Sequence, residues 1–235
     1  KLQDYCNEVI KELGFQKPTP IQEKVIPLVL KNRDIIGISQ TGTGKSHAFL
    51  LPIMSRIDVN KDCVQAVITA PTRELAAQLF NNAKTFTKYL PELRVSLIVG
   101  GSDRQRAVNK LSTQPHVVIG TPGRIKDLSL DAQALQITTA KTFVVDEADM
   151  TLEFGYLEDI DAVAGKMSDD LQMMVFSATI PQNLRPFLKK YMQSPVTIEI
   201  DSKLVTTANV EHILLATKHQ DRYDVLKKIM ATIDP

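Results

Sequence analysis

The sequence is poor in the residues that build metal sites and disulfides. It has no tryptophan, and only two cysteines and four histidines among 235 residues. Cys6 and Cys63 form no ligand pair, so we interpret them as reduced thiols and expect a cytoplasmic protein. The histidines show no metal-ligand spacing, which argues against a zinc site. They are His47, His116, His212 and His219.

Long apolar runs and an excess of charge of one sign are also missing. No apolar stretch reaches the roughly 18 residues that a membrane-spanning helix needs, and no secretory signal opens the chain, so we expect no membrane partner. The formal net charge is only +1, and any nucleic-acid surface must therefore be local. The chain begins at Lys1 without an initiator methionine, and we expect it to be a fragment of a longer protein.

Short β-branched apolar runs alternate with amphipathic stretches along most of the chain. This alternation predicts an α/β fold in which a parallel sheet of about seven strands carries helices on both faces. The predicted strands are Ile35–Ser39, Ala66–Ala70, Val95–Val99, Val117–Gly120, Thr142–Asp146, Met173–Ala178 and Val196–Ile200. The predicted helices include Glu74–Tyr89, Asp103–Leu111, Leu157–Met167 and Asn183–Tyr191. In such a sheet ligands bind beyond the carboxyl ends of the strands, where the polar signatures of this sequence occur.

The segment "SQTGTGKS" has the form of a phosphate-binding loop except at its first position. The pattern G-x-x-x-x-G-K-[ST] requires a glycine where Ser39 stands. A helix that opens near Gly44 after a Gly-rich turn presents backbone N–H groups to phosphates, and its N-terminus favours their negative charge. Lys45 would reach the β- and γ-phosphates of ATP, and the hydroxyl of Ser46 would ligate Mg²⁺. The predicted phosphate contacts are Ser39, Gln40, Thr41, Gly42, Thr43, Gly44, Lys45 and Ser46.

We expect Lys45 to be partly exposed, because its task is to supply charge to phosphate rather than to pack in the core. On that view Lys45→Ala abolishes tight ATP binding without unfolding the domain.

A second signature, "TFVVDEAD", is an apolar strand that ends in carboxylates. Asp146 is placed to hold Mg²⁺ through water, and Glu147 to orient or activate the attacking water. A phosphate loop together with carboxylates at a strand end predicts nucleotide hydrolysis. The predicted catalytic residues are therefore Lys45, Asp146 and Glu147.

Five motifs resemble the first RecA-like domain, a P-loop NTPase fold, of the DEAD-box ATP-dependent RNA helicases. They are "SQTGTGKS" at Ser39–Ser46, "PTRELAAQ" at Pro71–Gln78, "TPGR" at Thr121–Arg124, "DEAD" at Asp146–Asp149 and "SAT" at Ser177–Thr179. That family has Ala or Ser at the first position of its phosphate loop, so Ser39 marks a subclass rather than a damaged site. The resemblance spans the chain from about Leu13 to its end. It implies an enzyme that couples RNA-stimulated ATP hydrolysis to the unwinding or remodelling of RNA duplexes.

The segment "GFQKPTPIQ", Gly14–Gln22, resembles the adenine-reading segment of the same family. An amide can pair with the N6 donor and the N7 acceptor of adenine, and the resemblance assigns that task to Gln22. It places the side chain of Phe15 and the backbone of Lys17 around the base. Taken alone, the segment is better interpreted as a proline-containing turn that enters a helix at Ile21.

The resemblance also implies a surface that binds the sugar-phosphate backbone of RNA without sequence preference. The matching positions are Pro71, Thr72, Arg73, Gly100, Gly101, Thr121, Gly123 and Arg124. Singly, "PTREL" reads as a helix start with Thr72 as N-cap and "VGG" as a turn, but their joint placement at strand ends favours RNA contacts. Arg104, Arg106 and Lys110 are expected on a solvated helix face.

The "SAT" element is expected to couple the nucleotide state to RNA. In the family it hydrogen-bonds toward the acidic motif, and Asp149 offers an acceptor for Ser177 or Thr179; the alternative is a pair of hydroxyls that end a strand. "Phe154-Gly155-Tyr156" resembles the helix start that follows the acidic motif, and core packing suffices to explain it.

The domain prediction divides the chain into three parts. Residues 1–200 form the N-terminal RecA-like domain, 201–209 a linker, and 210–235 the start of a truncated second RecA-like domain. We expect a monomer whose partners are RNA and its own C-terminal RecA-like domain. Two alternatives stay open: a DNA translocase of the same superfamily, and a non-enzymatic, ATP-dependent RNA clamp.

Overall fold

The computed structural model describes residues 2–101, 103–200 and 221–232. It divides the chain into two units, Lys1–Ser202 and Lys203–Pro235. The described part of the second unit is one helix, α10 (Arg222–Thr232). The predicted linker at 201–209, and residues 210–220 of the predicted second domain, lie outside the described residues.

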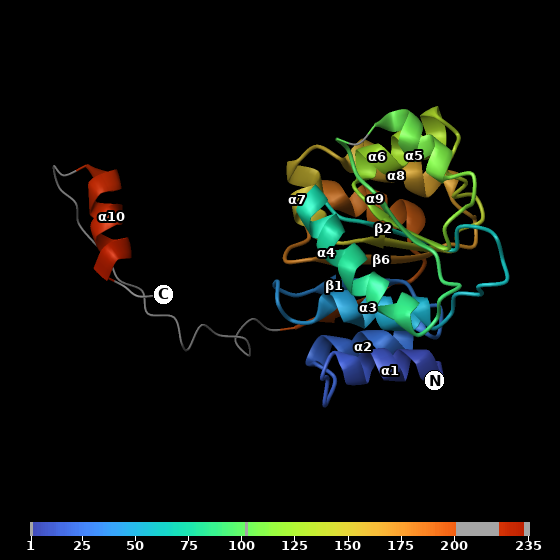
Figure 1. The fold of residues 1–235 in the computed structure, drawn as a ribbon, viewed down its shortest axis with the longest axis horizontal. Coiled ribbons are helices and arrows are strands. Elements are labelled where there is room, and N and C mark those ends of the chain that lie inside the picture. Colours follow the sequence, from blue (N-terminus) through green and yellow to red (C-terminus); the bar gives the residue numbers. More distant parts are fainter. Residues whose placement is uncertain (1, 102, 201–220, 233–235) are drawn as a thin grey trace. The chain divides into compact units, whose positions relative to one another are not determined.

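A seven-stranded parallel sheet forms the centre of the first unit (Figure 1). The strands lie in the order β3-β4-β2-β5-β6-β1-β7. They are β1 (Ile35–Ile38), β2 (Ala66–Thr69), β3 (Val95–Ile98), β4 (Val117–Gly120), β5 (Thr142–Val145), β6 (Gln172–Ser177) and β7 (Val196–Glu199). Each strand begins and ends within one residue of its predicted bounds, so the predicted α/β fold is confirmed. Continuous apolar runs were a reliable signal because most of these strands are buried on both faces.

Helices cover both faces of the sheet (Figure 1). Those of the first unit are α1 (Asp4–Glu12), α2 (Pro20–Val29), α3 (Lys45–Met54), α4 (Arg73–Lys84), α5 (Arg104–Lys110), α6 (Pro122–Lys126), α7 (Ala148–Glu153), α8 (Leu157–Lys166) and α9 (Arg185–Tyr191). Shorter turns are η1 (Thr85–Lys88), η2 (Asp127–Asp131) and η3 (Gln182–Leu184). None of the described helices is long and apolar enough to span a bilayer.

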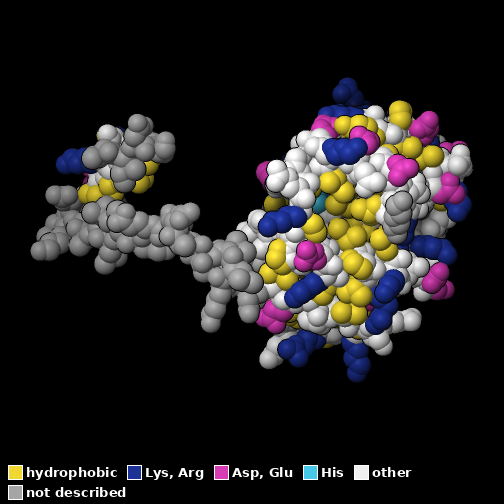
Figure 2. Space-filling model, turned by 90° about the horizontal axis from the view of Figure 1, so that it is seen from below, with side chains coloured by type: hydrophobic (Ala, Val, Ile, Leu, Met, Phe, Trp, Pro, Cys, Tyr) yellow, Lys and Arg dark blue, Asp and Glu magenta, His cyan; other side chains and the backbone are white. Residues whose placement is uncertain are grey.

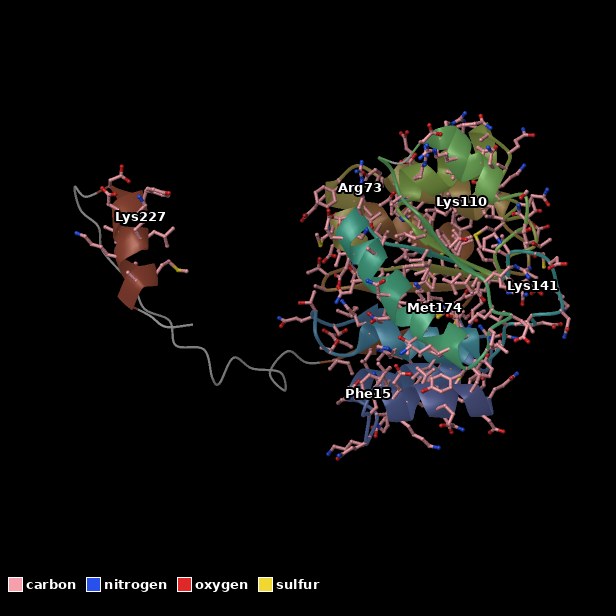
Figure 3. The ribbon with its side chains drawn as sticks, in the orientation of Figure 1. Phe15, Arg73, Lys110, Lys141, Met174 and Lys227 are labelled. Atoms are coloured by element: carbon pink, nitrogen blue, oxygen red, sulfur yellow. The ribbon has the colours of Figure 1, made fainter. Side chains whose placement is uncertain are left out.

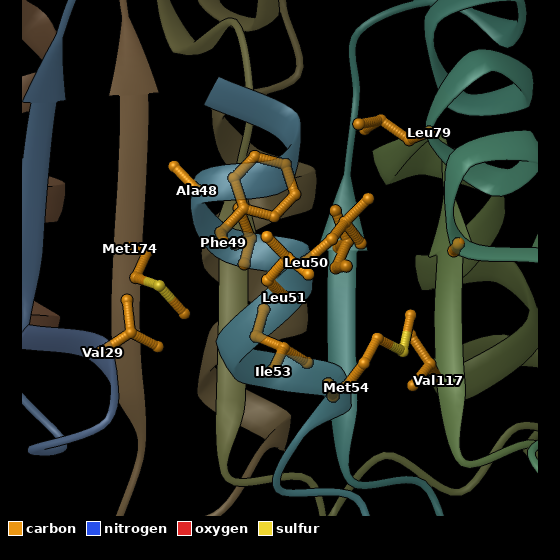
Figure 4. Packing of buried hydrophobic residues seen from close by; sticks show 14 of the residues in the cluster. Val29, Ala48, Phe49, Leu50, Leu51, Ile53, Met54, Leu79, Val117 and Met174 are labelled. Carbon is orange, nitrogen blue, oxygen red and sulfur yellow. The ribbon is translucent and has the colours of Figure 1, made fainter. Parts of the chain in front are cut away.

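Two apolar layers hold the sheet between the helices. Because side chains alternate along a strand, Val144 of β5 packs with α1–α4 whereas Phe143 and Val145 pack with α6, α8 and α9. Helix α3 is buried along most of its length. Figure 4 shows its Leu50 and Met54 beside residues of the strands.

Two predicted helices differ from the structure at their ends. The stretch predicted as Glu74–Tyr89 is α4 followed by the 3₁₀ turn η1. The hydroxyl of Thr87 donates to the carbonyl of Lys84 at 2.8 Å, which competes with continued α-helical hydrogen bonding. The stretch predicted as Asn183–Tyr191 begins as the turn η3 before α9.

The strand order determines which signatures become neighbours. Strand β6 lies between β1 and β5, so the loop after β1 and the carboxylates after β5 flank the end of β6. Strands β2, β4 and β3 continue the sheet on the other side of β5. Within the first unit, Figure 3 shows Phe15 and Arg73 on one side and Lys141, which precedes β5, on the opposite side.

The surface carries no single sign of charge on the face that Figure 2 shows. Lys and Arg side chains are interspersed there with Asp and Glu, as the formal net charge of +1 leads one to expect. Any attraction for an anion must therefore come from local geometry.

Candidate nucleotide site and nucleic-acid groove

The phosphate loop connects β1 to α3 and is closed by its own hydrogen bonds. The hydroxyl of Thr43 contacts the carbonyl of Gln40 at 3.0 Å and the hydroxyl of Ser39 at 3.2 Å. Gly44 caps α3 with φ of +92°, and a Cβ there would come within 2.8 Å of the Gln22 amide nitrogen. Only glycine accommodates both the left-handed backbone and this close approach.

Lys45 is buried, with 5% of its surface exposed, and the expectation of partial exposure is wrong. Its Nζ donates to Oε1 of Glu147 at 2.8 Å and to the carbonyl of Ser39 at 3.1 Å. The side chain of Lys45 therefore turns back onto the phosphate loop, and the carboxylate of Glu147 after β5 supplies its counter-charge. These two contacts engage two of the three N–H donors of the Lys45 ammonium group.

The two carboxylates after β5 lie in different surroundings. Burial, and then the neighbouring charge of Glu147, raise the pKa of Asp146 to about 7, although Lys45 acts in the opposite direction. Glu147 adopts φ of +49°, a strained conformation for a residue with a side chain. At this strained position its side chain reaches Lys45.

These residues fit Mg²⁺ as a companion of ATP rather than as a metal held by the protein alone. Within the described part of the chain, no group of three or more His, Cys, Asp or Glu side chains is arranged so that it could hold a metal ion by itself. Ser46 and Asp146 offer oxygen donors, and Mg²⁺ commonly takes one or two carboxylates and completes its shell with substrate phosphates and water. The buried Asp146 makes no ion pair with any described residue, so a cation would relieve its burial.

The adenine-reading segment lies directly against the phosphate loop. Gln22 accepts from the N–H of Thr19 at 3.0 Å, which completes a capping box at the start of α2, and donates to the carbonyl of Gly44 at 3.2 Å. Both ends of the amide are thus engaged within the protein. Gln22 therefore fits both interpretations of this segment. It caps a helix, and it also contacts the loop that would hold phosphate.

A histidine that sequence analysis missed lies beside this segment. The ring of Phe15 meets the ring of His47 edge-on, with centroids 5.0 Å apart. Burial lowers the pKa of His47, and its Nε2 has no hydrogen-bond partner among the described residues. The only sequence signal was its place in the first turn of α3, after the phosphate loop. Lys17, the other predicted neighbour of the base, is exposed.

The "SAT" element meets the acidic motif as expected. The hydroxyl of Ser177 accepts the N–H of Asp149 at 3.0 Å, and both the N–H and the hydroxyl of Thr179 donate to Asp149 Oδ2, at 3.2 and 3.3 Å. The carbonyl of Ser177 also accepts the N–H of Ser39 at 3.0 Å. One chain of hydrogen bonds therefore runs from the phosphate loop to the acidic motif.

A groove of about 630 Å³ lies at the carboxyl ends of β2, β3 and β4. It is lined by seven of the eight predicted nucleic-acid residues, namely Pro71, Thr72, Arg73, Gly100, Thr121, Gly123 and Arg124. The eighth, Gly101, has φ of +89°, and a Cβ there would come within 2.4 Å of an Arg73 guanidinium nitrogen. Thr72 is also the N-cap of α4, since its hydroxyl accepts the N–H of Leu75.

Asp127 joins two arginines at the edge of this groove. One oxygen accepts from Nε and Nη2 of Arg104 at 2.9 and 2.8 Å, and the other accepts from Arg124 at 2.8 Å. Arg104 is therefore tied to the groove, and the expectation that it only solvates a helix face is incomplete. Asp127 itself was missed, because an isolated aspartate carries no motif.

The expectation that Phe154 packs in the core is wrong. Phe154 is 53% exposed and lines the groove instead. Helix α7 ends at Glu153, and Gly155 turns the chain with φ of +77°. This turn leaves the Phe154 ring outside both apolar layers.

A second cavity of about 510 Å³ lies away from these motifs, at the amino ends of β1, β5 and β6. Arg56 in its wall donates to the carbonyl of Val29 at 3.0 Å and to the Gln172 side chain at 2.6 Å. Gln172 in turn donates to the carbonyl of Arg33 at 2.8 Å. This polar network joins α2, α3 and β6, which is a structural task.

Comparison with known proteins agrees with this geometry. Residues 19–187 match the DEAD/DEAH box helicase family. The DEAD-box ATP-dependent RNA helicase CshB of Listeria monocytogenes is 52% identical over 234 residues, which cover 99% of this chain and 54% of that protein. The protein of the same name from Bacillus subtilis is 48% identical over 237 residues, again covering 54% of its length. The chain thus spans about half the length of these curated relatives.

A solved structure shares the fold over nearly the whole chain. The crystal structure of a DEAD box protein from the hyperthermophile Methanococcus jannaschii matches with a TM-score of 0.80 at 31% identity. The match covers 98% of this chain and 61% of that one.

Proposed function

This chain belongs to the DEAD/DEAH box helicase family, and from that premise we propose that it is the ATP-binding half of an ATP-dependent RNA helicase. The complete enzyme would couple RNA-stimulated ATP hydrolysis to the unwinding or remodelling of RNA duplexes. The observation that supports this most directly is the 2.8 Å contact of Lys45 with Glu147, since it brings a phosphate-binding lysine and a hydrolytic carboxylate into one site.

The chemistry follows from an exchange of partners at Lys45. The triphosphate of ATP carries more negative charge than Glu147 and would replace it as the partner of the lysine. The released Glu147 would then orient the attacking water and accept its proton. Ser46 and Asp146 would hold Mg²⁺, which neutralises charge on the β- and γ-phosphates when bound.

Recognition of adenine would be linked to the same loop. The Gln22 amide would pair with N6 and N7 of the base, in exchange for its contacts with Thr19 and Gly44. Because Gly44 caps α3, this exchange would reach the phosphate site. Phe15 and the backbone of Lys17 would border the base.

RNA would bind in the groove through its sugar-phosphate backbone, without sequence preference. The hydrogen bonds among Ser39, Ser177, Asp149 and Thr179 support a role in linking the nucleotide state to this groove. The C-terminal RecA-like domain of the same protein would be the second partner, and would supply the arginine that faces the γ-phosphate. We further propose that the protein works as a monomer in the cytoplasm.

Comparing RNA with DNA as activators of steady-state ATP hydrolysis tests this function in the full-length protein. We expect single-stranded RNA to stimulate turnover and DNA of the same sequence to fail. Equal stimulation by DNA would identify a DNA translocase. RNA binding that depends on ATP, but without any hydrolysis, would identify a clamp.

A further inference from the structure

Phe154 is the most exposed large apolar side chain of the first unit's described residues, at 53%. The others are Phe15 at 37% and Tyr89 at 39%. Phe154 follows the last residue of α7, where the N–H of Phe154 donates to the carbonyl of Met150 at 3.0 Å. Its backbone is therefore held firmly while its ring belongs to neither apolar layer.

The ring lies in the same groove as the predicted RNA-backbone residues. Arg73 lines this groove, and no carboxylate of the described chain forms an ion pair with it. Arg124 lines the groove as well, but it forms an ion pair with Asp127. A phosphate held by Arg73 would therefore lie in one groove with an uncommitted aromatic face.

The neighbouring aromatic residue shows why Phe154 is the one available. Tyr156 also lines the groove, but its ring lies against the backbone of Gly123, where an added Cβ would be 3.8 Å from Cε1. Tyr156 is half-buried and its N–H donates to the carbonyl of Thr151. It supports the groove wall, whereas Phe154 offers a free face.

We propose that Phe154 is a stacking platform for an unpaired base of the RNA strand whose phosphates bind beside Arg73. This inference rests on the proposed RNA-helicase function and adds a base contact to a surface otherwise made of backbone contacts. Guanidinium and aromatic groups together are the combination by which proteins hold single strands, because every base has a π-face. Bases in a duplex are already stacked, so the contact favours a single or locally opened strand.

The base contact can be tested in the full-length protein, bound to a non-hydrolysable ATP analogue, by changing residue 154 and the RNA bases separately and together. Wild type and Phe154→Ala are titrated into a short single-stranded RNA and into the same strand with abasic riboses, by fluorescence anisotropy. Phe154→Ala should weaken binding of the normal strand by about 5- to 150-fold, the range for loss of one base–aromatic stack. Binding of the abasic strand should change less than about two-fold, since no base is left to stack.

Tyr89→Ala is the matched control, because Tyr89 is also an exposed aromatic residue but contacts Glu12 of α1, away from the groove. It should leave both affinities unchanged. Unchanged ATP affinity and an unchanged melting temperature of Phe154→Ala would show that the variant folds normally.

The results separate the inference from the function on which it rests. Equal losses on normal and abasic RNA would mean a contact to the backbone, and base stacking would be refuted. No loss on either strand, with wild type still binding RNA, would refute stacking on Phe154 and leave the helicase proposal intact. Failure of wild type to bind either strand would overturn both proposals.

A fluorescence measurement on the 235-residue chain gives an independent readout. The sequence contains no tryptophan, so Phe154→Trp introduces a single tryptophan that can be excited selectively at the red edge of the absorption band, where the five tyrosines do not absorb. Saturating RNA should quench its emission by stacking, and Tyr89→Trp should show no quenching. Equal quenching of the two variants would count against a base stacked on residue 154.

Discussion

Separating Lys45 from Glu147 should destabilise the domain, although we propose that Lys45 serves to bind ATP. The two charges are 2.8 Å apart, and their side chains are 5% and 9% exposed. Removing one member of such a buried pair leaves the other charge uncompensated, at a cost of about 3–5 kcal/mol. For a domain of this size each kcal/mol lowers the melting temperature by about 2–4 °C, so Lys45→Met should lower it by about 6–20 °C. Methionine keeps the side-chain volume, so the loss reports charge rather than a cavity.

A double-mutant cycle without nucleotide measures this coupling by calorimetric melting. Glu147→Gln should also destabilise the domain, whereas the double variant Lys45→Met/Glu147→Gln should recover most of the loss because it buries no unpaired charge. Lys141→Met is the control, since Lys141 pairs with Asp170 at the surface and should barely change the midpoint. A normal melting temperature for Lys45→Met, or additive losses in the double variant, would refute the buried pair. Titration of ATP into folded Lys45→Met should show that tight binding is lost.

The remaining predictions concern recognition of adenine, the buried Asp146 and the proposed second domain. Gln22→Ala should reduce discrimination between ATP and GTP by about 1–3 kcal/mol, by analogy with base readout in DNA; equal weakening of both, measured by calorimetry, would make Gln22 purely structural. Measured in chelator, Asp146→Asn should raise the melting temperature more at pH 8 than at pH 5. The pKa of Asp146 is raised to about 7 in the folded state, so the folded protein loses stability as the pH rises from the carboxyl's pKa in the unfolded chain toward 7. An effect of equal size at both pH values would contradict this. The isolated chain should hydrolyse ATP poorly even with saturating RNA, because an arginine finger is worth roughly 10³–10⁵ in rate and the second domain would supply it. Glu147→Gln in the full-length protein should abolish hydrolysis while ATP stays bound, and turnover of the isolated chain equal to that of the full-length protein would show that one domain suffices.

Local patterns in the sequence were sufficient to predict the strands and to place the motifs at their ends. Each strand is a short apolar run whose burial on both faces makes the pattern continuous, so the prediction needed no knowledge of its neighbours. The phosphate loop and the acidic motif are contiguous segments, and their residue types suit the ligand that we propose for them. The expected contacts of Asp149 with the "SAT" element also appear in the structure, because both segments end adjacent strands.

The tertiary structure alone decided how these groups are paired and which side chains are left exposed. Lys45 and Glu147 are 102 positions apart, and only the order β5-β6-β1 brings them together and buries them. The double engagement of Gln22 depends likewise on α2 lying against the phosphate loop. Phe154 is hydrophobic, as core residues usually are, yet the turn at Gly155 leaves its side chain in the groove. Burial depends on where the chain turns as well as on hydrophobicity.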